Sequence, residues 1–186
     1  MPIMSPSGND GRQGNPPQQV ATHAEIIEPR SGIPGLVIPC QEDLAIALVP
    51  DESLISSWQG DVTNGYDTPV TTANPAPGMK VKKFGRTTAL THGKIESAVT
   101  RTAVKYESEH FNATVWFRGA WVVRPVGIDP FGVGGNSGSL IVTEDGSATV
   151  GMLFAANVKG NYALIVPVER ILAAFGGLEL VGSHGV

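Results

Sequence analysis

Cysteine is almost absent from this sequence: Cys40 is the only one among 186 residues, so no disulfide can form within the chain. Small secreted domains often depend on such bridges, and their absence favours a reducing compartment. A single cysteine beside an apolar stretch is typical of a small buried residue. Charge is scarce too, with 16% Asp, Glu, Lys and Arg and a net charge of −4. A nucleic-acid surface needs clustered Lys and Arg, so we expect no nucleic-acid partner.

Long hydrophobic runs are also missing. No stretch approaches the length of a transmembrane helix, and we expect no membrane partner. The segment Met1–Gly8 has neither a charged n-region nor an apolar h-region, so it does not predict a signal peptide. The compartment stays open, and would be cytoplasmic if Met1 is the true start. No two histidines have the spacing of metal ligands and Cys40 is alone, so neither a metal nor another cofactor is expected.

Glycine and proline are abundant, at 23 and 14 residues, and 41% of the chain is hydrophobic. This mixture favours an all-β fold of many short strands joined by tight turns. Residues 1–19 and 57–79 are rich in turn formers and are predicted to be loops, the second a connector between two halves. A turn is also predicted at Thr91–Gly93. The hydrophobic patterns predict strands over 20–28, 43–49, 81–88, 94–104, 113–126, 139–142, 148–155 and 162–168.

Only the end of the chain has helical spacing. The segment Val168–Phe175 predicts a short helix that stops at Gly176 and Gly177. Lys80, Lys82 and Lys83 are the nearest approach to a basic run, and strand alternation places two of them on one solvated face. The whole pattern predicts a Greek-key barrel closed by a C-terminal helix.

The segment with the clearest chemistry is Gly134-Gly-Asn-Ser-Gly-Ser-Leu-Ile-Val142. A serine hydroxyl needs a base to remove its proton, and the tetrahedral intermediate needs donors for its oxyanion. Glycines on both sides of Ser137 allow a tight curl of backbone that supplies such donors. We therefore predict Ser137 as a nucleophile, with the N–H groups of Gly135 and Ser137 as the oxyanion hole. The alternative is an ordinary Gly/Ser-rich turn without chemistry.

Gly134–Ser139 resembles the Gly-Asp-Ser-Gly-Gly signature of chymotrypsin-fold peptidases, in the Gly-x-Ser-Gly-Ser form of some bacterial members. Gly85-Arg-Thr-Thr88 is similar to the hairpin that opens the second barrel of streptogrisin-like proteases. Val150–Ala156 resembles the strand that lines their primary specificity pocket, and Pro167–Leu172 resembles their closing helix. The resemblance covers roughly residues 40–178. It implies an all-β, chymotrypsin-like double Greek-key β-barrel with a short C-terminal helix and a polypeptide substrate.

The resemblance also assigns roles. Asp43-Leu-Ala-Ile-Ala-Leu48 is similar to the family's Asp-Ile-Ala-x-Leu segment, so Asp43 would orient the histidine of the triad; a strand-starting Asp at a turn is the alternative. The specificity pocket would involve Phe131, Phe154, Ala155 and Ala156, which suggest an apolar floor, although Asp129 is close in sequence. Residues 1–73 are predicted to form a partial first barrel, and residues 74–186 the second barrel with the nucleophile loop and the helix.

The first departure from the family's pattern concerns the histidine of the triad. Only His23 precedes Asp43, and a spacing of 20 residues is too short for the usual strands between these triad members; His92, His110 and His184 all follow it. We therefore expect the general-base histidine to be encoded upstream of Met1, with His23 as the second choice; an in-frame stop directly upstream would contradict this.

Two further departures concern the surroundings of the triad. Asn136 stands where the animal enzymes carry an acid, so activation by an ion pair with a freed N-terminus is not expected. Phe154 replaces a serine that supports the catalytic aspartate in many relatives.

Two rival functions remain to be weighed. An α/β-hydrolase would use Ser137, Asp145 and His184 in that order, but its elbow needs glycine at Ser139 and an alternating strand–helix pattern. The stronger rival is a catalytically inactive protease-like β-barrel that acts as a binding module, because a chain without a general base would retain only the oxyanion hole and substrate binding.

Overall fold

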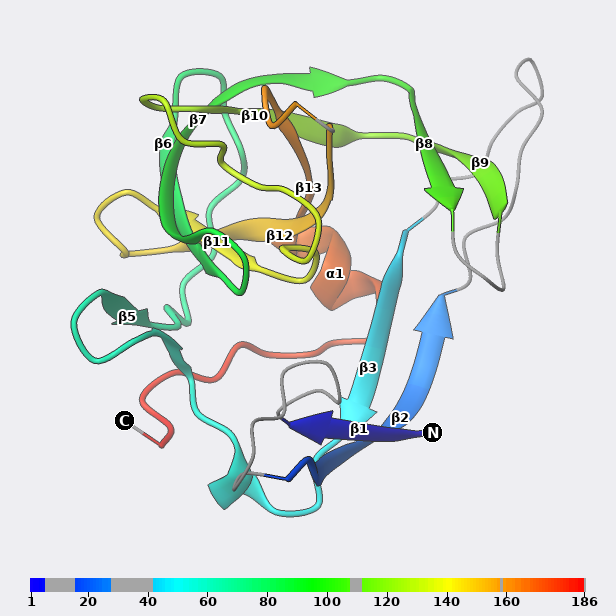
Figure 1. The fold of residues 1–186 in the computed structure, drawn as a ribbon, viewed down its shortest axis with the longest axis vertical. Helices are drawn as coiled ribbons and strands as arrows, with labels where there is room; N and C mark the ends of the chain where they lie inside the picture. Colours follow the sequence, from blue (N-terminus) through cyan, green and yellow to red (C-terminus); the bar gives the residue numbers. More distant parts are fainter. Residues whose placement is uncertain (6–15, 28–41, 108–111, 158, 186) are drawn as a thin grey trace.

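The computed structural model describes residues 1–5, 16–27, 42–107, 112–157 and 159–185. Within these ranges nearly all regular structure is β, as predicted, and the one α-helix lies near the C-terminus (Figure 1). The strands are β1 (Pro2–Ser5), β2 (Gln18–Ile27), β3 (Leu44–Leu48), β4 (Trp58–Gly60), β5 (Gly65–Asp67), β6 (Lys80–Gly85), β7 (Ala89–Val99), β8 (Thr102–Glu107), β9 (Asn112–Phe117), β10 (Ala120–Pro125), β11 (Leu140–Thr143), β12 (Thr149–Ala156) and β13 (Ala163–Pro167). The 3₁₀ helix η1 spans Glu52–Leu54 and α1 spans Val168–Ala174.

Six antiparallel strands of the second half close into a barrel in the order β10-β13-β12-β11-β6-β7. The chain makes one meander through β6, β7 and β10 and a second through β11, β12 and β13, and the two meanders join along β10–β13 and β11–β6. This is the Greek-key closure that the alternating patterns predict. The centre is filled by fully buried side chains of Val81, Ile95, Val123, Phe131, Ile141, Val150, Leu153, Ala163 and Ile165.

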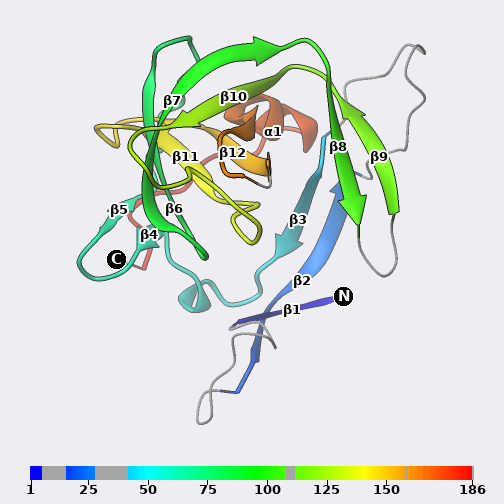
Figure 2. The same cartoon turned by 45° about the horizontal axis from the view of Figure 1, so that its top comes forward.

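Strands β7 and β10 continue beyond the barrel into the two-stranded sheet β8–β9. The predicted single strands over 94–104 and 113–126 are therefore each two strands. The second break falls at Gly119, whose φ of 64° is left-handed and suits glycine. A second apolar cluster packs under this hairpin and contains Phe117 and Phe154. Figures 1 and 2 both show the hairpin reaching over toward β3.

The predicted turn at Thr91–Gly93 is wrong: these residues lie inside β7, and the chain turns instead at Arg86–Thr88. Gly93 is needed for packing, because a Cβ there would lie 2.6 Å from Val123 Cγ1 and 2.7 Å from Phe131 Cδ2. Thr91 is buried, and its hydroxyl donates to the Phe131 carbonyl at 2.9 Å. Glycine and threonine thus fit a strand that passes close to a core aromatic ring.

The first half contains the three-stranded sheet β1-β2-β3, which does not close on itself within the described ranges. The strand β1 lies in a segment predicted to be a loop, and β4 and β5 lie in the predicted connector. These short strands have few apolar residues, and they form by pairing with a neighbour rather than through their own pattern. Tyr66 of β5 attaches the connector to the barrel, because its hydroxyl accepts from Phe84 N at 3.0 Å.

The C-terminal tail returns to this connector after α1. The backbone N–H of Ser183 donates to Asp67 Oδ2 at 2.6 Å, and that of His184 donates to Ser57 Oγ at 2.9 Å. The Ser57 hydroxyl in turn donates to Asp67 Oδ1 at 2.5 Å. These bonds fasten the end of the chain to the connector between the two halves (Figure 1).

Candidate active site

The loop predicted to carry the nucleophile, residues 134–139 and called the nucleophile loop below, lies between β10 and β11 and is fixed to the barrel at its C-terminal end. The amide of Gly138 donates to the Leu153 carbonyl at 2.7 Å, and the Leu153 amide donates to the Ser139 carbonyl at 3.0 Å. Two tight turns precede this link, closed by Asn136 N to Val133 O and by Ser139 N to Asn136 O. The strand that follows Ser137 therefore holds the loop in register with β12.

Glycines permit the shape of this loop. Gly135 and Gly138 have φ values of 89° and 87°, in the region that other residues avoid. A Cβ on Gly135 would also lie 2.5 Å from Thr87 Oγ1, which itself donates to the Gly134 carbonyl at 3.0 Å. The β6–β7 turn thus packs directly against the loop.

The amides of Gly135 and Ser137, like that of Gly134 before them, have no hydrogen-bond acceptor within the described part of the chain. They flank Asn136, whose amide is used in a turn. Ser137 itself is exposed, and its hydroxyl donates to the Phe154 carbonyl at 3.3 Å. The loop therefore presents a hydroxyl and two N–H groups without an acceptor, which are groups that acyl transfer requires in addition to a base.

Asn136 supports the loop from below and has no exposed surface. Its Oδ1 accepts from Val133 N at 3.0 Å and from Thr88 Oγ1 at 3.2 Å. Its Nδ2 has no hydrogen-bond partner among the described residues. A buried amide with an unpaired N–H group is costly, so this side chain depends on the polar groups around it.

Lys83 is one of those groups, and the sequence did not indicate its position. It has no exposed surface, and its Nζ donates to Thr88 Oγ1 at 2.8 Å and to the Ala89 carbonyl at 3.4 Å. Burial lowers the pKa of Lys83 to about 8. The alternation of β6 could have indicated that Lys83 is buried, since this residue lies on the same face as the buried Val81 and Gly85. Its ammonium group is linked through Thr88 to Asn136 and so to the nucleophile loop.

Asp43 lies immediately before β3 and is half-buried. Its Oδ2 accepts a 2.7 Å hydrogen bond from the hydroxyl group of Tyr106 on β8. The neighbouring Glu42 is buried and forms an ion pair with Arg170 of α1. Both carboxylates at the start of β3 are therefore held by the second half of the chain.

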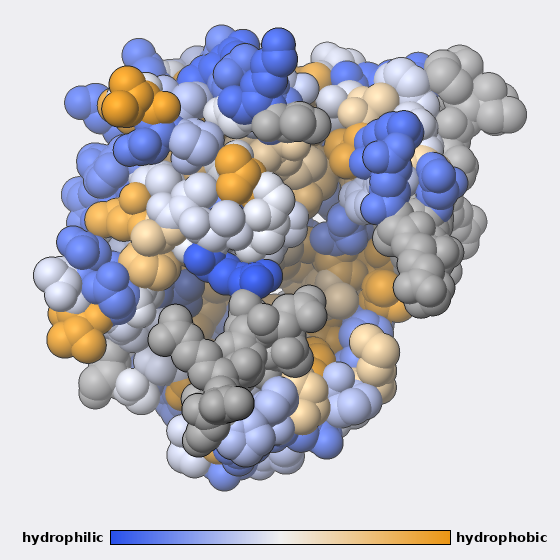
Figure 3. All heavy atoms as spheres, in the orientation of Figure 1, coloured by the Kyte–Doolittle hydropathy of each residue, from blue (hydrophilic) through white to orange (hydrophobic). Residues whose placement is uncertain are grey.

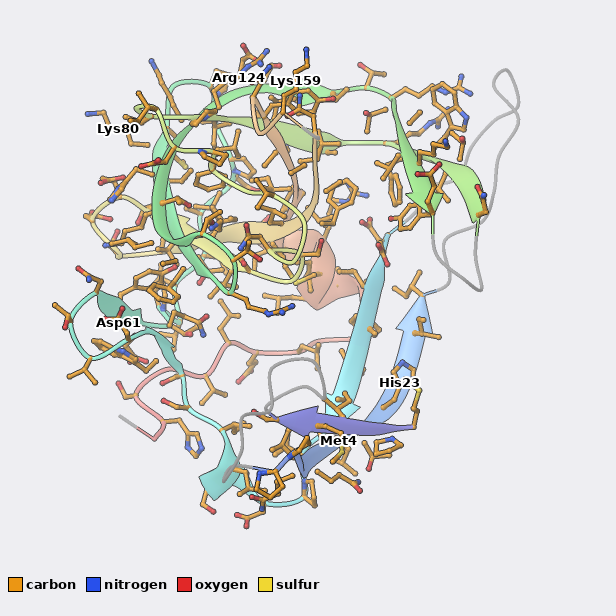
Figure 4. All side chains as sticks on the ribbon, in the orientation of Figure 1. Met4, His23, Asp61, Lys80, Arg124 and Lys159 are labelled. Carbon is orange, nitrogen blue, oxygen red and sulfur yellow. The ribbon has the colours of Figure 1, made fainter. Side chains whose placement is uncertain are left out.

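The described histidines contact neither Ser137 nor Asp43. His23 pairs with Ala47 across the β2–β3 sheet, three residues beyond Leu44, which is roughly 10 Å along the strand from the Asp43 end. Figure 4 shows it on the sheet of β1, β2 and β3, away from the barrel. The His92 ring bonds Glu144 at 2.8 Å, and the His184 ring bonds the Glu52 carbonyl at 2.8 Å. His110, like Cys40, lies outside the described residues.

The four predicted pocket residues divide into two kinds. Phe131 is fully buried in the barrel core, and Phe154 is 6% exposed and packs on Phe117 with ring centroids 4.9 Å apart. Ala155 and Ala156 are half-buried at the end of β12. Asp129 is exposed. Of this set, Ala155 and Ala156 are thus partly accessible, and Phe154 contacts Ser137 through its carbonyl.

Figure 3 shows a hollow between the barrel and strands β2 and β3, partly lined by hydrophobic residues. Among the described residues there is no cluster of three or more His, Cys, Asp or Glu side chains that could hold a metal ion. In the same ranges, no helix has the length and apolar character needed to cross a membrane.

Several solved structures share this architecture. A glutamic-acid-specific serine protease that binds substrate with a histidine triad aligns with a TM-score of 0.61 and 21% identity, over 91% of this chain and 77% of that one. Thermobifida fusca protease A aligns with a TM-score of 0.60 and 18% identity, over 87% of this chain and 84% of that one.

Cellulomonas bogoriensis chymotrypsin aligns with a TM-score of 0.59 and 20% identity, over 95% of this chain and 84% of that one. No family model and no curated protein matches the sequence. The chain has the fold of the bacterial chymotrypsin-like serine proteases.

Proposed function

We propose that this chain is built for serine-type peptide hydrolysis, with Ser137 as the nucleophile and Asp43 orienting a histidine base. The observation that carries the proposal is the nucleophile loop: an exposed serine lies between Gly135 and Gly138, whose φ values are 89° and 87°, and the amides of Gly135 and Ser137 have no acceptor in the described structure. In such a loop the hydroxyl attacks the substrate carbonyl carbon, and the two amides stabilise the oxyanion that forms.

The base must accept the proton of Ser137 and return it to the leaving amine. His23, His92 and His184 are placed elsewhere, so the proposal requires an imidazole from outside the described residues. The 3.3 Å bond from Ser137 Oγ to the Phe154 carbonyl is the resting position of the hydroxyl, from which it would turn to this base.

For the substrate, we infer a polypeptide with a small or apolar side chain before the scissile bond. Ala155 and Ala156 are the predicted pocket side chains that are partly accessible, and neither carries charge. A charged substrate side chain would find no partner on them. Peptide p-nitroanilides that end in Ala, Leu, Lys or Glu test this: the Ala and Leu compounds should be cleaved fastest, and preferred cleavage after Lys or Glu would contradict it.

The decisive experiment is labelling with a fluorophosphonate probe, which reacts with activated serines. We expect labelling of the wild type and none of Ser137→Ala, while Ser147→Ala, which removes an exposed hydroxyl in the β11–β12 turn, should label normally. A second arm adds imidazole, which should accelerate labelling where the protein's own base is missing. Equal signals from wild type and Ser137→Ala in both arms would favour the alternative, a catalytically inactive binding module.

A further inference from the structure

Tyr106 reaches from the second half of the chain to the candidate catalytic aspartate. It lies on β8, and its hydroxyl donates to Asp43 Oδ2 at 2.7 Å across a separation of 63 residues. Burial, and then the hydrogen bond to Asp43, raises the pKa of the Tyr106 phenol above its ordinary value. The phenol therefore keeps its proton at neutral pH and remains a donor to the carboxylate.

Aromatic packing fixes the tyrosine ring. Its centroid is 6.4 Å from that of Phe117, which is 1% exposed, and Phe117 is 4.9 Å from Phe154. The Phe154 carbonyl accepts a hydrogen bond from the hydroxyl of Ser137. A continuous row of contacts thus joins the two candidate catalytic side chains: Asp43, Tyr106, Phe117, Phe154 and Ser137.

A carboxylate that orients an imidazole must hold one oxygen toward the ring N–H. Its other oxygen needs a donor, since a half-buried charge is stabilised by hydrogen bonds to it. Many proteases meet this need with a serine at the position that Phe154 occupies here, and Phe154 has no hydroxyl. Tyr106 supplies a hydroxyl from a different strand and leaves Oδ1 of Asp43 for an imidazole.

We propose that Tyr106 is a positioning residue for the reaction: its hydroxyl holds the Asp43 carboxylate in the orientation that the histidine base requires. This inference rests on the proposed function. The competing role is structural, in which the same bond only fastens β3 to the β8–β9 hairpin. The two roles differ in what a loss of the hydroxyl changes, the rate at Ser137 or the stability of the fold.

Tyr106→Phe removes the hydroxyl and keeps the ring on Phe117. We expect its rate of labelling by the fluorophosphonate, and its kcat on a peptide ester, to fall roughly tenfold, with KM and the melting temperature unchanged. The matched control is Tyr162→Phe, because Tyr162 has its ring over Arg124, 5.7 Å from the guanidinium, and does not touch Asp43. A wild-type labelling rate in Tyr106→Phe, or a lower melting temperature without a change in rate, would overturn the proposal.

Asp43→Asn completes a double-mutant cycle. If the hydroxyl acts through the carboxylate, Tyr106→Phe will slow labelling in the wild-type background and have no further effect in Asp43→Asn. Equal slowing in both backgrounds would overturn the inference. Failure of the wild type to label above Ser137→Ala would remove the proposed function and this inference together, whereas normal Ser137 labelling that is insensitive to Tyr106→Phe removes only the inference.

Discussion

At the scale of single residues, Gly85 is where three polar groups of the candidate site converge. A Cβ at this position would lie 2.5 Å from Asn136 Nδ2, 2.7 Å from Ser139 Oγ and 3.0 Å from Lys83 Nζ. Asn136 and Ser139 belong to the loop that carries Ser137, and Ser139 Oγ donates to the Asn136 carbonyl at 2.7 Å. The glycine is therefore required by the close approach of these side chains to the end of β6.

Gly85→Ala should consequently disturb the nucleophile loop. We expect a loss of roughly 1–3 kcal/mol in the free energy of unfolding, typical of overpacking, and a fall in fluorophosphonate labelling of the remaining folded protein. Gly134→Ala is the control within the same loop, because nothing lies within 4 Å of a Cβ there. Urea denaturation and labelling rates measure both effects. Similar stabilities for the two variants would contradict the packing argument.

The burial of Lys83 leads to a second prediction, which concerns how the free energy of unfolding depends on pH. Burial lowers its pKa from 10.5 to about 8. Below pH 8 both the folded and unfolded states hold the proton, and the folded state bears the full cost of burying the charge. Between pH 8 and 10.5 the folded state loses the proton while the unfolded state keeps it, so the free energy of unfolding rises with pH.

Lys83→Met removes this titration. The stability of the variant relative to the wild type should therefore decrease by up to about 3 kcal/mol between pH 7 and pH 10.5. Urea denaturation at intervals across this range measures the difference. Lys80→Met is the control, since Lys80 is exposed on the same strand. A difference between Lys83→Met and wild type that stays constant with pH would show that Lys83 does not titrate as its burial requires.

At the scale of elements, helix α1 joins the two halves of the molecule through Arg170. Its Nη2 pairs with Glu42, and its Nη1 donates to the carbonyls of Arg118 and Gly119 at 3.0 and 2.9 Å. The side chains of Arg170 and Glu42 are 26% and 11% exposed. Because a largely buried carboxylate without its cation is costly, the pair fixes the chain just before Asp43.

Arg170→Met should thus lower the free energy of unfolding by roughly 3 kcal/mol. The double variant with Glu42→Gln should recover part of that loss, because it removes the stranded charge. Arg124→Met is the control: its bond to Glu96 at 3.0 Å is exposed, and such pairs contribute less than about 1 kcal/mol. Urea denaturation compares the three. Equal losses from Arg170→Met and Arg124→Met would contradict the proposed link.

The elements also show how far sequence patterns reach. Hydrophobic patterns predicted the strands of the second barrel, because the apolar side chains of these strands fill its core. Helical spacing predicted a helix over Val168–Phe175, and the structure has one over Val168–Ala174. The turn at Arg86–Thr88 and the strand β1 were missed, since each depends on a partner distant in sequence: the turn packs on Gly134 and Gly135, and β1 forms by pairing with β2. The residues next to these segments in the sequence do not indicate which distant segments they will contact.

The candidate site follows the same division. Ser137 and its glycines were readable because a tight loop demands particular residues at adjacent positions. The contact between Tyr106 and Asp43 and the burial of Lys83 arise from residues that meet only in the folded chain. The register that separates His23 from Asp43 is likewise a property of the β2–β3 sheet. The roles of Tyr106 and Lys83 therefore became visible only in the three-dimensional structure.

At the scale of the whole molecule, stability is concentrated in the second barrel. Among the described residues before Ser56, the buried hydrophobic side chains are Ala21 and Leu44, whereas the barrel core contains Val81, Ile95, Val123, Phe131, Ile141, Val150, Leu153, Ala163 and Ile165. Exposed apolar residues mark the first half instead, including Ile26 at 50% and Leu48 at 67%. Since apolar burial is the main favourable term in folding, the two halves should open at different free energies.

Native-state hydrogen exchange measured by mass spectrometry tests this difference. Peptides that cover β6, β7 and β10–β13 should exchange last, at the rate of global unfolding, and peptides from β2 and β3 should exchange earlier by local opening. Arg170→Met serves as the internal comparison, because loss of the link to Glu42 should accelerate exchange in β3 more than in the barrel. Uniform protection across both halves, unchanged in the variant, would mean that the first half draws its stability from packing other than these contacts with the barrel.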